Sequence, residues 1–443
     1  MLRMFTTYIE ALDWIHARLR LGIKPGLKRM EWMMDKLGHP ETKMKTVHIG
    51  GTNGKGSTVT FLRSILEAGG YTVGTFTSPY IEQFNERISV NGKAISDEEL
   101  LQLANVIRPL ADELEETELG GPTEFEVITA MAFHYFATMN QTDIVIFEVG
   151  LGGRFDSTNI IQPLASIITN IGLDHTNILG TTYAEIAFEK AGIIKENTAI
   201  FTAVKHPDAL KVIEEQADKR NAPIYRLNQE FSISDHQSQA KGEVFDVITP
   251  FQPIGKLGIS MIGQHQTENA ALAVIAAQFL NQKGSFLVSE QAIRAGLKKA
   301  YWPGRFELLS ENPLVIVDGA HNEEGVTALT HELTSRYANR QIQLVFAAMA
   351  DKKLDQMIAK LDKIATQITF VSFDFPRAAK AEQLLNISQS PNKLAVDDWG
   401  PYLIEEIQHL ENNSMLVITG SLYFISEVKP FLDNYLKNKI ISL

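Results

Sequence analysis

The sequence of 443 residues contains no cysteine. This absence excludes disulfides, thiolate zinc sites and a cysteine nucleophile. A basic excess is also missing, because 53 acidic residues against 41 lysines and arginines give a net charge of −12, which argues against a nucleic-acid or anionic-membrane surface. No apolar run approaches membrane-spanning length, and residues 1–20 do not have the pattern of a signal peptide. We therefore expect a cytoplasmic, monomeric enzyme without nucleic-acid or membrane partners.

The chain is too long for a single hydrophobic core, and its first part has the pattern of an α/β domain. Short runs rich in Val, Ile and Phe alternate with helical periods, and several runs are continuous, as in strands that helices cover on both faces. The predicted strands are Thr46–Ile49, Thr72–Phe76, Ile144–Val149, Ala165–Thr169 and Ala199–Ala203. The pattern predicts a large, mostly parallel sheet of the P-loop type, with helices on both faces, over residues 1–300.

A second, smaller domain is predicted over residues 301–443. Before it, residues 206–262 are rich in polar turns and are predicted as the edge of the first domain, with some antiparallel strand. The pattern restarts after residue 304 with four apolar strands, Leu314–Val317, Gln341–Ala347, Ile368–Phe373 and Met415–Thr419. These strands predict a Rossmann-like α/β domain. The helices predicted before it are Thr58–Ala68, Glu124–Thr138, Tyr183–Ala191 and Thr267–Leu280.

A glycine-rich segment, residues 50–57, follows the first predicted strand and reads Gly-Gly-Thr-Asn-Gly-Lys-Gly-Ser. Glycines at such a junction let successive backbone N–H groups turn toward an anion, and the helix N-terminus adds its positive dipole end. Lys55 can reach terminal phosphates, and the Ser57 hydroxyl can bind Mg²⁺. Gly56 departs from the usual spacing, and the alternative is a plain turn with an incidental lysine. The flanking strand and helix favour a phosphate cradle, and hence use of ATP or GTP.

Polar residues follow other predicted strands, at the edge where open parallel sheets bind ligands. Glu148 ends a buried strand, where Mg²⁺ beside bound phosphates would neutralise it; the alternatives are a helix cap or a salt bridge to Arg154. His175 taken alone is equally well a packing residue, and Ser78 before a proline is alone a turn residue. Their common position beside residues 50–57 favours a shared site.

Other residues keep two interpretations from the sequence. Lys190 lies in the last turn of a predicted helix, where a lysine complements the dipole, so the residue by itself indicates a structural role. In the second domain, Asp318, His321 and Asn322 follow a buried strand, which favours a functional loop, although Asp also caps helices. The segment 302–305 at the domain junction is either part of a ligand site or a rigid linker.

Together these motifs resemble the folylpolyglutamate synthase and dihydrofolate synthase family, within the Mur ligase group, over nearly the full length. In chain order the motifs are residues 48–57, 77–80, 84–88, 148–154, 173–175, 189–194, 302–305, 318–322 and 419–421. The extra glycine at position 56 is typical of that family. The resemblance supports the fold and the use of ATP.

The resemblance implies a role for residues of both domains. ATP would be bound by Asn53, Gly54, Lys55, Gly56 and Ser57, and from its far side by Asn269, Arg305 and Asp318. Mg²⁺, at two sites, would be bound by Ser78, Glu148, His175 and Lys190, the last as a carbamate. The acceptor substrate would lie near Thr123, Phe125, Arg154 and Asp156, and glutamate near His321 and Ser421. The implied catalytic residues are Lys55, His175, Lys190 and His321.

The implied reaction joins a folate or dihydropteroate carboxylate to the amino group of L-glutamate. The carboxylate attacks the γ-phosphate of ATP, and the acyl phosphate is converted to an amide, which gives ADP and phosphate. Positioning and electrostatics carry such chemistry, so no side-chain nucleophile is needed, in agreement with the missing cysteine. The sequence leaves open which acceptor is used, although Arg154 and Asp156 resemble the versions that use both.

Three functions of other classes were weighed against this one. A GTPase-like switch would need Asn-Lys-x-Asp after a strand, and residues 392–395 lack the aspartate. A small-molecule kinase would use the same cradle but needs no amino-acid site on a second domain. A non-catalytic scaffold would leave the polar residues at many strand ends without a function. Dependence of ADP release on glutamate separates the ligase from the kinase, and binding of GTP alone would support the switch.

Overall fold

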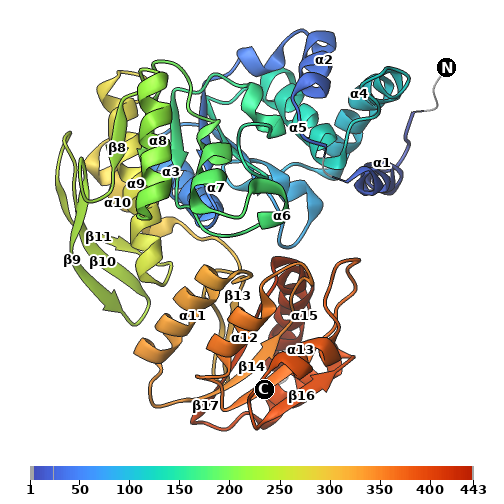
Figure 1. The fold of residues 1–443 in the computed structure, drawn as a ribbon, viewed down its shortest axis with the longest axis vertical. Helices are drawn as coiled ribbons and strands as arrows, with labels where there is room; N and C mark the ends of the chain where they lie inside the picture. Colours follow the sequence, from blue (N-terminus) through green and yellow to red (C-terminus); the bar gives the residue numbers. More distant parts are fainter. Residues whose placement is uncertain (1–3, 23, 442–443) are drawn as a thin grey trace. The chain divides into compact units, whose positions relative to one another are not determined.

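The computed structural model describes residues 4–22 and 24–441, and the chain divides into two compact units (Figure 1). The first unit comprises Met1–Gln237, Val244–Ser260 and Gln266–Tyr301, and the second comprises Ser238–Glu243, Met261–His265 and Trp302–Leu443. Each unit is built on a sheet of its own with strands of mostly parallel direction. The predicted α/β fold class is therefore confirmed.

The first unit contains an eight-stranded sheet in the order β4-β3-β2-β5-β1-β6-β7-β8. The six strands from β2 to β8 run parallel, and β3 and β4 pair antiparallel at one edge. The strands are β1 (Thr46–Gly50), β2 (Val73–Phe76), β3 (Ile88–Val90), β4 (Lys93–Ala94), β5 (Ile144–Glu148), β6 (Ala165–Ile168), β7 (Ala199–Thr202) and β8 (Ile224–Arg226). Every residue of β1, β2, β5, β6 and β7 is buried, which explains why these strands are rich in Val, Ile and Phe.

Helices pack on this sheet through separate apolar clusters. One cluster joins α1, α2, α4 and α5 to Phe147 of β5, and another joins α7 and α8, which lie side by side in Figure 1, to Ile200 of β7. α3 and α10 approach so closely that a Cβ on Gly296 would lie 2.5 Å from Ile65 Cα. The helices are α1 (Tyr8–His16), α2 (Lys28–Leu37), α3 (Lys55–Ala68), α4 (Asp97–Glu115), α5 (Glu124–His134), α6 (Thr176–Leu179), α7 (Tyr183–Ala191), α8 (Pro207–Lys219), α9 (Gln264–Gln282) and α10 (Glu290–Lys299).

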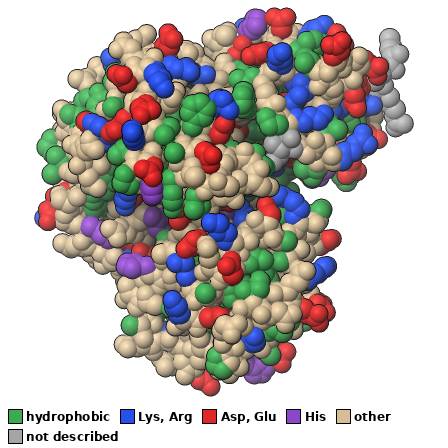
Figure 2. All heavy atoms as spheres, viewed as in Figure 1, with side chains coloured by type: hydrophobic (Ala, Val, Ile, Leu, Met, Phe, Trp, Pro, Cys, Tyr) green, Lys and Arg blue, Asp and Glu red, His purple; other side chains and the backbone are tan. Residues whose placement is uncertain are grey.

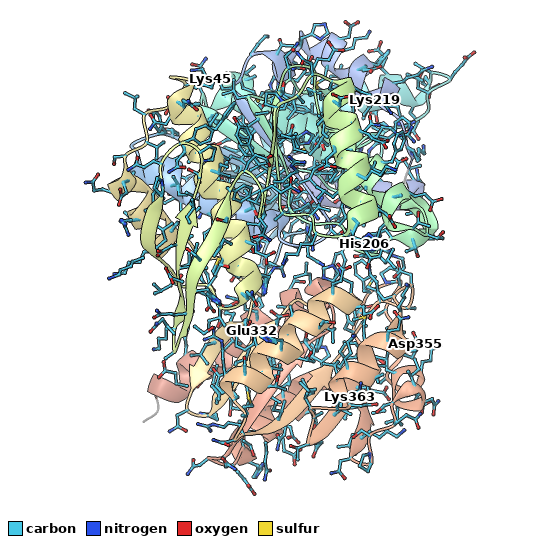
Figure 3. The ribbon with its side chains drawn as sticks, turned by 60° about the vertical axis from the view of Figure 1, so that its left-hand side comes forward. Lys45, His206, Lys219, Glu332, Asp355 and Lys363 are labelled. Carbon is cyan, nitrogen blue, oxygen red and sulfur yellow. The ribbon has the colours of Figure 1, made fainter. Side chains whose placement is uncertain are left out.

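The prediction for residues 206–262 was incomplete, because it missed α8. His206 and Lys219 mark the two ends of this helix in Figure 3. Proline is favourable in a first helical turn, and Ala209, Ile213 and Ala217 recur every four residues to form its buried stripe. The antiparallel part is a three-stranded sheet in the order β11-β10-β9, made of β9 (Ser232–Gln239), β10 (Gly242–Ile248) and β11 (Ile254–Ile259).

The second unit contains a six-stranded sheet in the order β12-β13-β17-β14-β15-β16, in which only β12 is antiparallel. The strands are β12 (Glu307–Glu311), β13 (Leu314–Asp318), β14 (Gln341–Phe346), β15 (Gln367–Val371), β16 (Lys393–Val396) and β17 (Ser414–Thr419). The helices are α11 (Glu323–Arg336), α12 (Leu354–Leu361), α13 (Ala381–Ile387), α14 (Trp399–His409) and α15 (Leu422–Ile441). Two apolar clusters, one around Phe370 and one around Phe424, form its core.

The distribution of charged side chains on the surface and the polarity of the helices agree with the amino-acid composition. Figure 2 shows acidic and basic side chains interspersed over the visible face of each unit. Among residues 4–22 and 24–441, no helix combines the length and the apolar character that crossing a bilayer requires.

One buried histidine gives a testable pH dependence of stability. His48 is fully buried in β1, and burial, with a smaller contribution from Lys195, lowers its pKa to about 3. An unfolded histidine titrates near 6.5, so between these values the folded protein binds fewer protons and loses stability as the pH falls. His48→Phe should lose less stability than the wild type when urea unfolding is followed from pH 7 to pH 4. Parallel stability curves for the two proteins would contradict the assignment.

Candidate active site

Two glycines of the phosphate cradle, residues 50–57, have no room for a side chain. Gly51 and Gly54 have φ angles of +142° and +84°. A Cβ on Gly51 would lie 1.9 Å from Thr169 Oγ1, and one on Gly54 would lie 2.3 Å from Asn269 Oδ1. The backbone therefore follows a path that only glycine adopts easily, and it brings the predicted nucleotide residue Asn269 against the cradle.

The loop after β6 holds the cradle in place. The Asn53 N–H donates to Asn170 Oδ1 at 2.7 Å, and Thr169 Oγ1 donates to the Asn53 carbonyl at 2.6 Å. Further along, the Gly172 N–H donates to Thr52 Oγ1 at 2.9 Å. The cradle is thus preorganised by the strand end that also leads to His175.

The N-terminus of α3 is open to an anion. The helix spans 14 residues and begins at Lys55, three residues earlier than predicted, and its N-cap residue, Gly54, has no side chain that could cap the first N–H groups. Lys55 Nζ donates to the Thr52 carbonyl at 3.2 Å. Ser57 Oγ is buried, with the residue 1% exposed, and has no hydrogen-bond partner. A buried hydroxyl without a partner is costly, and a phosphate oxygen or a hydrated Mg²⁺ would satisfy it.

Ser78 and Glu148 lie together beside the cradle. Glu148 pairs in register with Ile49 of β1, is 4% exposed, and accepts a hydrogen bond from the Ser78 N–H at 3.3 Å. Arg154 pairs instead with Glu189, because its Nη2 lies 2.6 Å from Glu189 Oε1. The alternative of a salt bridge between Glu148 and Arg154 is therefore wrong. The buried carboxylate is therefore placed next to the residues that would hold phosphates.

Lys190 does more than complement a helix dipole. The residue is 5% exposed, and its Nζ donates to the Gly51 carbonyl at 2.9 Å. Burial, and then the positive charge of Lys55, lowers the pKa of Lys190 to about 7. An amine with this pKa is largely neutral just above neutral pH and can act as a nucleophile.

The donor set suits Mg²⁺ bound together with phosphates. Among the residues that the structure describes, no group of three or more His, Asp or Glu side chains could hold a metal by itself. Mg²⁺ in nucleotide sites takes one or two carboxylates, waters and the phosphates themselves. Glu148 and the open Ser57 hydroxyl provide such oxygens, so these residues fit the ion. His175, in a left-handed conformation (φ 50°) after Asp174, would offer a nitrogen, which Mg²⁺ prefers less.

The loop after β5, residues 150–154, will be called the acceptor loop. Its backbone lies against Phe125, because a Cβ on Gly150 would be 2.4 Å from Phe125 Cζ. Asp156 is buried and accepts hydrogen bonds from the Leu151 N–H (2.8 Å), the Thr158 N–H (3.0 Å) and Thr158 Oγ1 (2.5 Å). Burial raises the pKa of Asp156, although these donors oppose the shift. Thr123 caps α5, two residues before Phe125. The structure therefore brings Phe125 and Asp156 to one loop.

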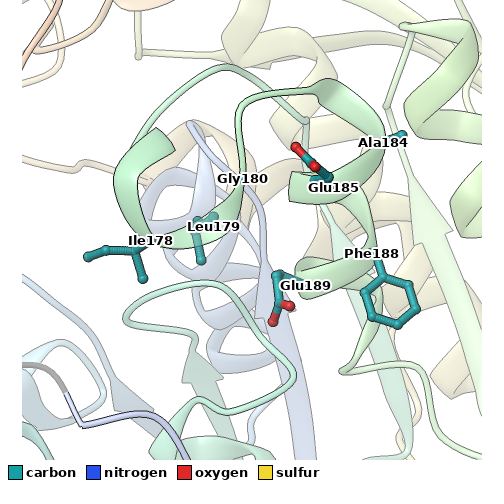
Figure 4. A pocket seen from close by; sticks show the side chains of 7 residues that line it. All are labelled: Ile178, Leu179, Gly180, Ala184, Glu185, Phe188 and Glu189. Carbon is teal, nitrogen blue, oxygen red and sulfur yellow. The ribbon is translucent and has the colours of Figure 1, made fainter.

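Arg154 lies near a groove that the sequence did not predict. Its guanidinium carbon lies 4.3 Å from the ring centroid of Phe155 and 5.0 Å from that of Phe188. Phe188 and Glu189 also line an open surface groove of about 490 Å³ (Figure 4). Both phenylalanines are unusually exposed for aromatic residues, but exposure is not visible in a sequence. The lining residues are Ile178, Leu179, Gly180, Ala184, Glu185, Phe188 and Glu189.

In the second unit, Asp318 ends β13 and does not cap the next helix. Its carboxylate accepts hydrogen bonds from the Phe306 N–H (2.7 Å) and the Ala320 N–H (2.8 Å), while Asn322 caps α11. Burial raises the pKa of Asp318, and the charge of Arg305 opposes this shift. The helix-cap alternative for Asp318 is therefore wrong.

Two hydroxyl groups without a hydrogen-bond partner lie just before α15. Thr419 and Ser421 are buried, and their Oγ atoms have no hydrogen-bond partner. Between them Gly420 has a φ of +114°, and a Cβ there would lie 2.3 Å from the Ala347 carbonyl. The sequence pointed to Ser421 within its motif but gave no separate role to Thr419. Hydroxyls and N–H groups at a helix N-terminus suit a carboxylate.

His321 lies on the loop after β13 in the same unit. Its Nδ1 is 2.8 Å from the Gly319 carbonyl oxygen, and because a carbonyl only accepts, Nδ1 carries a proton. The residues predicted to bind from this unit are Arg305, Asp318, His321 and Ser421, and all other predicted site residues belong to the first unit. Their individual roles remain predictions.

The comparisons with known proteins agree with this architecture. The Mur ligase middle domain matches residues 49–277, and the Mur ligase glutamate ligase domain matches residues 304–422. The fold, the phosphate cradle and these two matches identify the chain as a Mur ligase. The dihydrofolate synthase/folylpolyglutamate synthase of Bacillus subtilis (strain 168) is 51% identical over 433 residues, 97% of this chain and 100% of that protein. The chain belongs to the dihydrofolate synthase/folylpolyglutamate synthase family, as the motifs predicted.

Solved structures show the same similarity. The chain matches Mycobacterium tuberculosis folylpolyglutamate synthase complexed with ADP with a TM-score of 0.89 and 28% identity, over 96% of this chain and 98% of that one. It matches an FPGS–AMPPCP–folate complex (FPGS, folylpolyglutamate synthase) with a TM-score of 0.86 and 31% identity, over 96% and 100%. Those proteins hold a nucleotide and, in the second complex, folate.

Proposed function

We propose that this chain is an ATP-dependent ligase that adds L-glutamate to the carboxylate of a folate or of dihydropteroate. The observation that carries the proposal is the phosphate cradle, in which Gly51 and Gly54 admit no side chain and Ser57 Oγ is buried without a partner. Membership of the family supports a ligase over a kinase or a switch. Structures of related proteins include a complex with ADP and a complex with AMPPCP and folate.

The cradle residues would bind and orient ATP. Backbone N–H groups at the start of α3 donate to the phosphates, and Lys55 neutralises charge that spreads over the γ-phosphate during transfer. Asn269, already against Gly54, would meet the nucleotide from α9. For Arg305 and Asp318 of the second unit, nucleotide binding stays a prediction of the sequence.

Ser78, Glu148, His175 and a carbamylated Lys190 would hold Mg²⁺ at two sites. The ion supplies charge neutralisation for the phosphate oxygens when it is bound. The contribution of this chain is the Glu148 carboxylate at the end of β5 and the Ser57 hydroxyl in the first turn of α3. Because Glu148 and Ser78 already share a hydrogen bond, this part of the site is preorganised.

The acceptor would bind at the acceptor loop, with its ring system near Phe125 and its polar edge near Thr123, Arg154 and Asp156. We assign this binding and that of ATP to residues 1–300, and glutamate to residues 301–443. There His321 would receive a proton from the attacking amino group, and Ser421 would hold the substrate carboxylate.

The test is a coupled assay of ADP release with dihydropteroate and with a reduced folate, each with and without L-glutamate. The expected result is release that requires both an acceptor and glutamate, with the amide as product. Release without glutamate would support a kinase, and binding restricted to GTP would support a switch. Running both acceptors side by side also decides which of them is used.

Lys190→Ala should abolish most activity, and short carboxylic acids such as acetate should restore part of it. The reason is that a neutral amine, favoured by the pKa of about 7, can add CO₂ and release a proton to give a carbamate, which a carboxylate can replace. Lys195→Ala is the matched control, because Lys195 is half-buried with a pKa lowered to about 8, yet it donates to the Asn159 carbonyl. Full activity of Lys190→Ala, or equal stimulation of both variants, would contradict the role.

A further inference from the structure

We propose that His48 and Thr158 are positioning residues for the acceptor, acting through Asp156 on the acceptor loop. This inference rests on the proposed function, because the acceptor loop matters to it only as the place where the acceptor binds. Neither residue is exposed, so neither is expected to touch substrate.

A continuous chain of hydrogen bonds links β1 to the acceptor loop. His48 Nε2 lies 2.8 Å from Thr158 Oγ1, and Thr158 Oγ1 lies 2.5 Å from Asp156 Oδ1. The other carboxylate oxygen, Asp156 Oδ2, accepts from the Leu151 N–H at 2.8 Å. Residues 110 apart in the sequence are thus joined, and the last of the four groups is the backbone of the acceptor loop.

The chemistry of the groups fixes the direction of this chain. Both oxygens of Asp156 accept hydrogen bonds from backbone N–H groups, so this carboxyl group is also the acceptor toward Thr158. The single hydroxyl proton of Thr158 therefore points to Asp156, and the hydroxyl oxygen accepts from His48. His48 then carries its proton on Nε2. Its Nδ1, buried without a partner, is left as a lone pair, which costs less than an orphaned N–H.

This chain of hydrogen bonds connects a rigid strand to a loop whose backbone is rich in glycine. His48 is buried in the central strand that leads directly into the phosphate cradle, so its ring has little freedom. The acceptor loop contains Gly150, Gly152 and Gly153, whose backbone is intrinsically free. Through Thr158 and Asp156 the strand fixes the Leu151 N–H, and with it the loop segment that lies on Phe125. The same strand would thereby set the acceptor relative to the phosphates.

The first experiment compares Thr158→Val with Thr158→Ser by steady-state kinetics. We expect Thr158→Val to raise the KM for the acceptor by at least about tenfold, since a hydrogen bond to a charged group is lost. The KM for ATP and the KM for glutamate should stay within about twofold of the wild type. Thr158→Ser keeps the hydroxyl and should restore the acceptor KM, and Thr202→Val is the matched control, a buried threonine that only accepts from the Val204 N–H.

The second experiment is a double-mutant cycle with His48→Phe. If His48 acts through Thr158, the single variants should each weaken the acceptor, and the double variant should be no worse than Thr158→Val. Should Thr158→Val fail to fold, His48→Phe carries the same expectation for the acceptor KM.

The outcomes distinguish a failure of the proposed function from a failure of the positioning role alone. A wild-type protein without acceptor-dependent ADP release overturns the proposed function, and this inference falls with it. A wild-type protein that is active, with a Thr158→Val variant that keeps its acceptor KM, overturns only the positioning role. An equal rise in all three KM values, or additive effects in the cycle, would overturn it as well.

Discussion

Lys55→Ala is expected to reduce kcat/KM for ATP by about 10²–10³-fold, the largest effect of any single change proposed for this chain. The physical reason is that loss of one preorganised charge on the transferring phosphoryl group removes stabilisation present mainly in the transition state. The fold should not suffer, because the partly exposed side chain makes one hydrogen bond, to the Thr52 carbonyl. ADP release and the melting temperature, measured on the same preparation, check both statements.

Lys219→Ala is the control for this experiment. Lys219 is an exposed lysine in the last turn of α8, and its removal changes the net charge by the same amount. It should leave kcat/KM within about twofold, as ordinary surface changes do. Retained activity in Lys55→Ala, or an equal loss in the two variants, would remove the phosphate role of Lys55.

Glu148→Gln is expected to shift the Mg²⁺ dependence strongly, with at least a tenfold higher concentration needed for half-maximal rate and a loss of about 10²-fold at limiting Mg²⁺. The substitution keeps the shape of a side chain that is 4% exposed and keeps an oxygen that can accept from the Ser78 N–H. It removes only the charge that would balance the ion. A Mg²⁺ titration of ADP release measures the effect.

Glu41→Gln is the matched control for the loss of a buried acid. Glu41 is also buried, but it lies in a short turn after α2 and pairs with His39 at 3.0 Å. Its replacement can alter stability but should not move the Mg²⁺ midpoint. If the midpoint is unchanged in Glu148→Gln, Glu148 does not ligate the metal and its burial needs another explanation.

Local patterns of the sequence sufficed to locate the strands that position the site. β1, β5 and β6 were predicted to within one residue, because strands that are covered on both faces are rich in Val, Ile and Phe. The cradle was equally visible, since glycines at a strand-to-helix junction have few other uses. α8 was missed although its buried residues recur every four positions, because the polar residues between them looked like turns.

The sequence by itself determined the cradle, the strands that position it, and the family to which the chain belongs. These properties depend on residues close together along the chain. Only the tertiary structure decided which distant partners meet: Lys190 with the Gly51 carbonyl 139 residues away, Arg154 with Glu189, and His48 with Thr158. The physical reason is that such pairings depend on strand order and register, and the burial that lowers the pKa of Lys190 depends on the packing of the whole unit.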